Sequence, residues 1–136
     1  RDNVEPIVDG RWHAGAASGV RVGAAAVPRD TEAAIIVRAD EPRPSGVYRR
    51  LLDEHLRPGA AITRPAFEGT AGAPIVVDRA VLAELRNATD AAGGLDGILA
   101  RHAGTMLALA FDSGVVLMRI ETAEEYAAAR ESGAFD

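Results

Sequence analysis

Two carboxylates each stand directly behind an apolar run of the sequence. Asp40 follows residues 33–38 (AAIIVR), a run of strand length, and Glu121 follows residues 115–120 in the same way. Ligands of open α/β sheets bind beyond the carboxyl ends of the strands. Because carboxylate oxygens are hard ligands that suit Mg²⁺, both residues are candidate ligands of a phosphate-bound magnesium ion.

Each carboxylate also has a purely structural interpretation. Asp40 stands before Pro42 and Pro44, where an aspartate commonly caps a turn. Glu121 precedes a predicted helix, and an acidic residue there stabilises the helix dipole without any catalytic role. Position alone leaves both alternatives open for Asp40, and it favours the structural one for Glu121 taken singly.

Two segments of small residues are candidate ligand loops. Residues 15–23 (GAASGVRVG) would let backbone N–H groups approach a nucleotide, with Ser18 as the N-cap of a helix that runs to about Val27. Residues 67–74 (FEGTAGAP) are a second glycine-rich loop, which serves either a ligand or a tight connection into the next strand. Neither segment matches the P-loop or the dinucleotide-binding fingerprint, and glycine-rich turns are more often simple turns.

The remaining polar side chains carry weaker signals. Arg21, Arg43 and Arg49 could hold phosphate, although in a chain with fifteen arginines the ordinary alternative is solvated surface. The three histidines are too far apart for an H-x-x-x-H pair and are interpreted as structural or solvent-facing. No serine stands in a G-x-S-x-G context. The chain has no lysine, which excludes Schiff-base chemistry and the lysine of a P-loop.

Length and charge narrow the class of protein further. The 136 residues fit one domain, residues 1–136, and Arg1 in place of a methionine leads us to expect a processed or N-terminally incomplete chain. A net charge of −5 argues against a nucleic-acid partner. No apolar run approaches the ~20 residues of a membrane span. The absence of cysteine fits a cytoplasmic location.

Apolar runs alternate with helical patterns along the chain, which predicts an α/β fold. We expect strands at residues 4–8, 33–38, 60–63, 75–77, 106–111 and 115–120. We expect helices at about 18–27, from Pro44-Ser45 to a stop at Pro58-Gly59, at 81–86, at 95–102, and from the T-x-x-E capping box at Thr122 to Gly133. Asp112-Ser113-Gly114 would join the last two strands as an antiparallel hairpin. The expected fold is a three-layer, Rossmann-like mixed sheet with helices on both faces and this late hairpin.

Four segments, taken in order, resemble the later part of the nucleotidyltransferases similar to molybdenum-cofactor cytidylyl- and guanylyltransferases. Trp12 and residues 15–23 are similar to the family's W-x-x-G segment with its serine loop and helix. AIIVRADEPRPS is similar to the strand and D-Q-P turn that holds magnesium in the family, and FEGTAGAPIVVDR to the G-x-x-G-H-P loop. RIETAEEY is similar to the D-I-D-T-P-E-D-Y ending. No single motif is specific, so the ordered set carries the resemblance.

The resemblance implies Mg²⁺-dependent transfer of a nucleotidyl group from an NTP, CTP or GTP, to a phosphorylated small-molecule acceptor such as molybdopterin, with release of pyrophosphate. Asp40 would be the catalytic residue and the first metal ligand, and Glu121 the second. The resemblance further assigns nucleotide binding to Ser18, Gly19 and Arg21, and substrate binding on the acceptor side to Gly72 and Pro74.

The chain also departs from the family's pattern. It lacks the family's first strand and glycine-rich loop, with the lysine that grips the triphosphate, and Glu41 and Ala73 replace the glutamine of D-Q-P and the histidine of G-H-P. Arg119 replaces the first aspartate of D-I-D and would either neutralise a metal site or contact phosphate. Two hypotheses follow: a catalytic nucleotidyltransferase, and a non-catalytic nucleotide- or cofactor-binding domain that has lost the triphosphate loop. The ordered motifs disfavour a third, an α/β scaffold related by fold alone.

Overall fold

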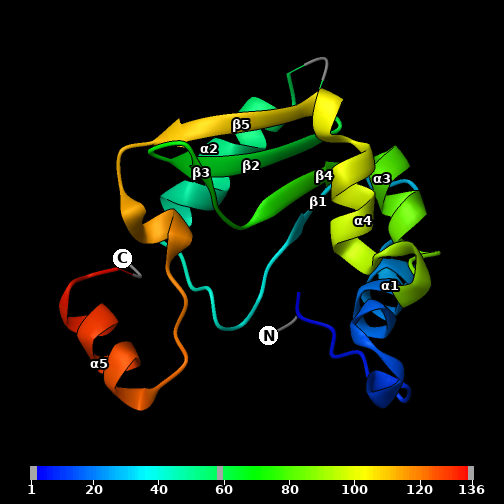
Figure 1. The fold of residues 1–136 in the computed structure, drawn as a ribbon, viewed down its shortest axis with the longest axis horizontal. Helices are drawn as coiled ribbons and strands as arrows, with labels where there is room; N and C mark the ends of the chain where they lie inside the picture. Colours follow the sequence, from blue (N-terminus) through cyan, green and yellow to red (C-terminus); the bar gives the residue numbers. More distant parts are fainter. Residues whose placement is uncertain (1–2, 58–59, 135–136) are drawn as a thin grey trace.

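A mixed five-stranded sheet forms the centre of the structure, a computed structural model that describes residues 3–57 and 60–134 (Figure 1). The strands are β1 (Ala33–Ile36), β2 (Ile62–Phe67), β3 (Thr70–Ala71), β4 (Ile75–Asp78) and β5 (Met106–Phe111). β4 lies antiparallel between β1 and β2, β3 forms an antiparallel hairpin with β2, and β5 runs parallel to β2 on its other side. β1, β2 and β5 therefore share one direction.

Helices cover both faces of this sheet (Figure 1). Consecutive residues of β4 point to opposite faces, as the pleat of a strand requires. Ile75 and Val77 pack with α1 (Ala16–Ala26), α3 (Arg79–Leu85) and α4 (Gly94–Arg101). Val76, fully buried, packs on the other face with α2 (Ser45–His55). The expected three-layer α/β architecture is confirmed.

Local signals explain where three of the helices begin. Val47, Leu51 and His55 are the buried residues of α2 and recur every four residues, the spacing of one helix face. The Asp78 side chain accepts a hydrogen bond from Val81 N and caps α3. Thr122 caps the terminal helix, α5 (Ala123–Glu131), in the same way through Glu125 N. The helix stop expected at Pro58-Gly59 lies outside the described residues, and α2 ends at His55.

The prediction of an antiparallel hairpin between residues 106–111 and 115–120 is wrong. Residues 115–120 do not form a strand, because Gly114–Leu117 is a short 3-10 helix followed by an extended segment, and β5 pairs with β2 instead. Val116 is fully buried in the core on the α2 face, and its carbonyl accepts a bond from Ala73 N at 3.0 Å. Long-range packing thus overrides the β preference of the valines.

Three further expectations are corrected. Residues 4–8 form no strand. The first α-helix begins at Ala16, and Asp90 Oδ1 accepts from Ala17 N at 3.1 Å, so Ser18 lies within the helix and is not its N-cap. The glycine-rich loop starts later than expected, since β2 continues to Phe67 and pairs with β3. Among the described residues, no helix is long and apolar enough to cross a membrane.

Candidate functional site

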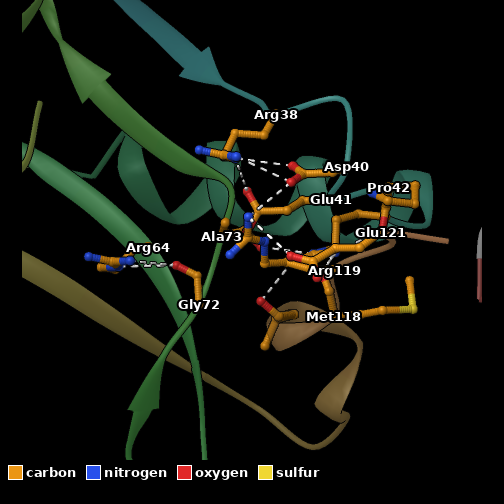
Figure 2. A network of polar contacts seen from close by, with 12 residues as sticks. Arg38, Asp40, Glu41, Pro42, Arg64, Gly72, Ala73, Met118, Arg119 and Glu121 are labelled. Carbon is orange, nitrogen blue, oxygen red and sulfur yellow. Dashed lines mark hydrogen bonds and ion pairs between the residues drawn. The ribbon is translucent and has the colours of Figure 1, made fainter. Parts of the chain in front are cut away.

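Asp40 and Glu121 come together from segments that are distant in the sequence (Figure 2). Asp40 lies four residues beyond the end of β1, in the turn that leads to α2. The segment between the 3-10 helix and α5 passes alongside this turn, and Ile120 N donates a 2.7 Å hydrogen bond to Asp40 O. The contact connects the backbones of the two segments that carry the predicted metal ligands.

Two arginines hold the Asp40 carboxylate (Figure 2). Arg38 Nε and Nη2 donate to Asp40 Oδ1 and Oδ2 at 3.0 and 3.2 Å. Arg119 Nη2 donates to Asp40 Oδ2 at 3.2 Å and also lies 3.5 Å from Glu121 Oε1. The Arg38 hydrogen bond, assisted by Arg119 and opposed by partial burial, lowers the pKa of Asp40 to about 2. Asp40 is therefore ionised throughout the physiological range.

The oxygen donors fit a small, partly built metal site. Oxygens of Asp40 and Glu121 both lie within 3.5 Å of one cationic nitrogen, so the fold already directs two carboxylates at one positive charge. Residues 3–57 and 60–134 contain no group of three His, Asp or Glu residues able to hold a metal ion. Magnesium is commonly bound by one or two carboxylates, with water and substrate phosphates completing its coordination. The two carboxylates match that kind of site.

A buried arginine joins the segments around the site. Arg43 is 5% exposed, and Nε donates to Ala73 O at 2.9 Å. Nη1 donates to Pro42 O and Met118 O at 2.8 and 2.9 Å, and Nη2 to Val116 O at 3.0 Å. Burial lowers the pKa of the guanidinium, which nevertheless remains charged in proteins. One side chain thus connects the turn after β1, the loop before β4 and the segment before Glu121.

Gly72 and Pro74 lie in the loop that Arg43 holds. A Cβ on Gly72 would come 2.2 Å from Val116 O, so only glycine allows the loop to pack this closely. Arg64 donates twice to Gly72 O, at 2.9 and 3.1 Å (Figure 2). The Ala73–Pro74 peptide is cis. The loop that contains the predicted acceptor-side residues therefore packs against the segment that leads to Glu121.

The predicted nucleotide-binding residues lie on α1, across the molecule from α5 (Figure 1). Ser18 is 2% exposed and donates to Asp9 Oδ1 at 2.8 Å, while Arg21 donates to Ala88 O at 2.6 Å. Gly19 and Arg38 both line a hollow of about 610 Å³ between α1, β1 and α4. The hollow connects the α1 face to the arginine beside Asp40, and the roles of Ser18, Gly19 and Arg21 in binding stay predictions.

Two histidines, His55 and His102, each form a hydrogen bond with another side chain of the fold. His55 is 6% exposed, and its Nδ1 lies 2.8 Å from the Thr63 hydroxyl. Burial lowers the pKa of His55. His102 pairs with Glu84, and this hydrogen bond lowers the pKa of the carboxylate. Neither residue is brought to Asp40 by these contacts.

The sequence did not predict that Arg43 is buried and connects three segments of the backbone. The alternatives considered for it were phosphate binding and solvated surface, and its burial contradicts the second. Its four carbonyl acceptors come from segments up to 75 residues away, so no local pattern marks them. Arg49, considered beside it, is exposed. The prolines on both sides of Arg43 are the only nearby signal, and they indicate a turn and not a buried cation.

The structure is that of a layered α/β domain with a carboxylate pair beyond the end of a strand. The sequence model of the MobA-like NTP transferase domain matches residues 1–106. The chain therefore belongs to the MobA-like NTP transferase domain family. The Glu121 segment lies beyond the matched residues. No curated protein matches the chain.

Three solved structures of similar fold come from mycobacteria. Rv0371c from Mycobacterium tuberculosis H37Rv is 24% identical with a TM-score of 0.64, over 87% of this chain and 61% of that one. A structure of Rv0371c in complex with manganese is 23% identical with a TM-score of 0.60, over 82% and 59%. A homologue from Mycobacterium sp. strain JC1 is 18% identical with a TM-score of 0.63, over 86% and 57%. This chain spans about three fifths of the length of these proteins, and the likeness shows the fold.

Proposed function

We propose that the protein is a divalent-metal-dependent nucleotidyltransferase that joins a nucleotide to a phosphorylated small molecule such as molybdopterin. A phosphate oxygen of the acceptor would attack the α-phosphorus of CTP or GTP. The bond from that phosphorus to the bridging oxygen would break, and pyrophosphate would leave. Membership of the MobA-like NTP transferase domain family supports this reaction class. A cytoplasmic location belongs to the same proposal, since the chain contains no cysteine.

The observation that carries the proposal is the meeting of Asp40 and Glu121. The two carboxylates approach a single cationic nitrogen at 3.2 and 3.5 Å, although 80 residues separate them in the chain. Their position beyond the end of β1 is where open α/β sheets bind ligands. A nucleotide whose phosphates share a metal ion needs an anionic site of this kind.

Asp40 and Glu121 would hold Mg²⁺, which when bound neutralises charge on the reacting phosphate. The solved Rv0371c complex with manganese supports an ion of this class. Arg38 would keep the Asp40 carboxylate ionised and oriented through its two hydrogen bonds. The hollow that extends from Gly19 to Arg38 would receive the nucleoside. Gly72 and Pro74 would shape the acceptor side, because their loop packs on the segment before Glu121.

A second candidate function is binding of a nucleotide or cofactor without catalysis. It is favoured by the charge balance around Asp40, since two arginines already occupy this carboxylate. Binding and turnover must therefore be measured separately.

The test uses the full-length protein with CTP or GTP, molybdopterin and Mg²⁺, and measures pyrophosphate release. We expect release from one nucleotide, and a loss of at least about a hundredfold in Asp40→Asn, the scale of one electrostatic contact in a transition state. Asp53→Asn on the exposed side of α2 is the matched control and should keep full turnover.

Each alternative has its own outcome. Unchanged turnover in Asp40→Asn would remove Asp40 from the site. Calorimetric binding of CTP or GTP with no pyrophosphate release from any variant would favour the non-catalytic candidate instead.

A further inference from the structure

Arg119 occupies the place between the two predicted metal ligands. The same nitrogen, Nη2, lies 3.2 Å from Asp40 Oδ2 and 3.5 Å from Glu121 Oε1 (Figure 2). Arg38 differs, because its ion pairs join Asp40 to the neighbouring Glu41. Of these two arginines, Arg119 is therefore the one that bridges the carboxylates from the two separate segments.

The charges at this point explain why the bridge exists. Asp40, Glu41 and Glu121 bring three negative charges to the turn. Arg38 and Arg119 form ion pairs with them, and the buried Arg43 is a third positive charge close to Asp40 and Glu41. Without a cation between them, the Asp40 and Glu121 carboxylates would repel each other. The arginine thus does for the carboxylate pair what a divalent ion would do.

The bridge is also weak enough to open. The Arg119 side chain is 52% exposed and that of Glu121 is 65% exposed. Ion pairs between exposed side chains each contribute only about 0–1 kcal/mol. Asp40 is more enclosed, at 25% exposed, but Arg119 itself is open to solvent, so it can leave the carboxylates at little cost when a stronger cation takes its place.

We propose that Arg119 is a built-in substitute for the metal: it bridges Asp40 and Glu121 in the metal-free protein and turns to the phosphates of the nucleotide when a divalent ion binds. The inference rests on the proposed function, because it takes Asp40 and Glu121 as the metal ligands. Phosphates would lie beside the ion, and a guanidinium matches a phosphate with two parallel hydrogen bonds. The sequence left two roles open for Arg119, neutralising a metal site and contacting phosphate. In this proposal the side chain has the first role in the metal-free protein and the second when the ion and the nucleotide are bound.

The proposal predicts effects of opposite sign in one variant. In Arg119→Gln, Mn²⁺ alone should bind about three- to tenfold more tightly, because the competing cation is gone. Mn²⁺ together with tripolyphosphate should bind more weakly than to the unmodified protein, because a phosphate contact is lost. A residue that only stabilised the fold would not reverse the sign of its effect when phosphate is added.

The experiment measures free Mn²⁺ by electron paramagnetic resonance in titrations of the full-length protein with Mn²⁺ alone. Binding of the preformed Mn²⁺–tripolyphosphate complex is measured by isothermal titration calorimetry, because tripolyphosphate itself chelates Mn²⁺. Arg38→Gln is the matched control, because it removes the same charge from the same carboxylate without breaking the bridge to Glu121. It should tighten Mn²⁺ binding less than Arg119→Gln does. Circular dichroism confirms that each variant is folded.

The outcomes separate this inference from the proposed function. Mn²⁺ binding that requires Asp40 but is unchanged or weaker in Arg119→Gln would overturn the role of Arg119 and leave the metal site standing. An equal gain in Arg38→Gln would also overturn it, since any loss of positive charge would then suffice. Failure of every variant to bind Mn²⁺ would overturn the metal site together with this inference.

Discussion

Replacement of Arg43 by lysine should destabilise the protein by about 3 kcal/mol. Arg43 donates four hydrogen bonds to carbonyls of three segments, and a hydrogen bond to a charged group contributes a net ~1.5–3 kcal/mol. A lysine keeps the charge but presents one nitrogen, which cannot reach all three segments at once. Loss of two of the four bonds gives about 3 kcal/mol at the lower end of that range.

Methionine at the same position would keep the alkyl stem and lose every donor. Its cost, roughly 5 kcal/mol or more, approaches the whole stability of many domains, so this variant is expected to unfold in part. Lysine is therefore the informative substitution, because the variant should remain folded under native conditions.

The assay is urea unfolding followed by far-ultraviolet circular dichroism. Fluorescence is a poor probe here, since the single tryptophan, Trp12, is 75% exposed in the folded protein. Arg49→Lys is the matched control, because Arg49 is an exposed residue of α2, and its change should stay within about 0.5 kcal/mol. The Mn²⁺ affinity of folded Arg43→Lys should also fall, because Arg43 connects the segments that carry Asp40 and Glu121.

Two results would refute this reasoning. A stability of Arg43→Lys within about 0.5 kcal/mol of the unmodified protein would show, on the scale expected for surface changes, that the four bonds contribute little. A clear loss of stability with unchanged Mn²⁺ affinity would show that Arg43 supports the fold without positioning the two carboxylates.

Two other substitutions probe the packing around the site and the core. Gly72→Ala should lower the free energy of unfolding in urea by about 1–3 kcal/mol, because its Cβ would lie 2.2 Å from Val116 O. The control Gly46→Ala, with nothing within 4 Å of its Cβ, should be neutral or stabilising. Equal effects of the two substitutions would contradict the close packing of the loop. Burial lowers the pKa of His55 below its ordinary value of 6.5, and a smaller effect of Asp78 opposes this shift. The contribution of His55 to the free energy of unfolding is therefore complete above pH 6.5 and is lost as the pH falls toward the folded-state pKa. Unfolding measured from pH 7 to pH 5 should show this fall in the unmodified protein and less of it in His55→Gln, and an equal slope in both would exclude His55 as the cause.

Elements with a strong local pattern could be predicted from the sequence. α2 and α5 begin where Pro44-Ser45 and Thr122 indicate, and β1, β4 and β5 lie within or close to their apolar runs. Periodicity and burial favour a helix in α2, the Thr122 cap favours one in α5, and the apolar runs favour strands, so the local signal and the tertiary structure agree in each of these segments.

The errors fall where a distant contact decides the local structure. Ser18 has the chemistry of an N-cap, yet α1 starts earlier because Asp90 supplies the capping oxygen to Ala17 N. Residues 115–120 have the composition of a strand, yet Val116 is buried outside the sheet ladder and held through its carbonyl. A sequence pattern contains no record of such partners.

The candidate site shows the same division. The sequence by itself determined that Asp40 and Glu121 each follow an apolar run and that these 136 residues contain no lysine or cysteine. Only the tertiary structure decided that the two carboxylates meet, that Arg119 lies between them and that Arg43 joins the segments that carry them. The reason is physical: residue type and local spacing set which groups are available, whereas the distance between them depends on long-range hydrogen bonds such as Ile120 N to Asp40 O.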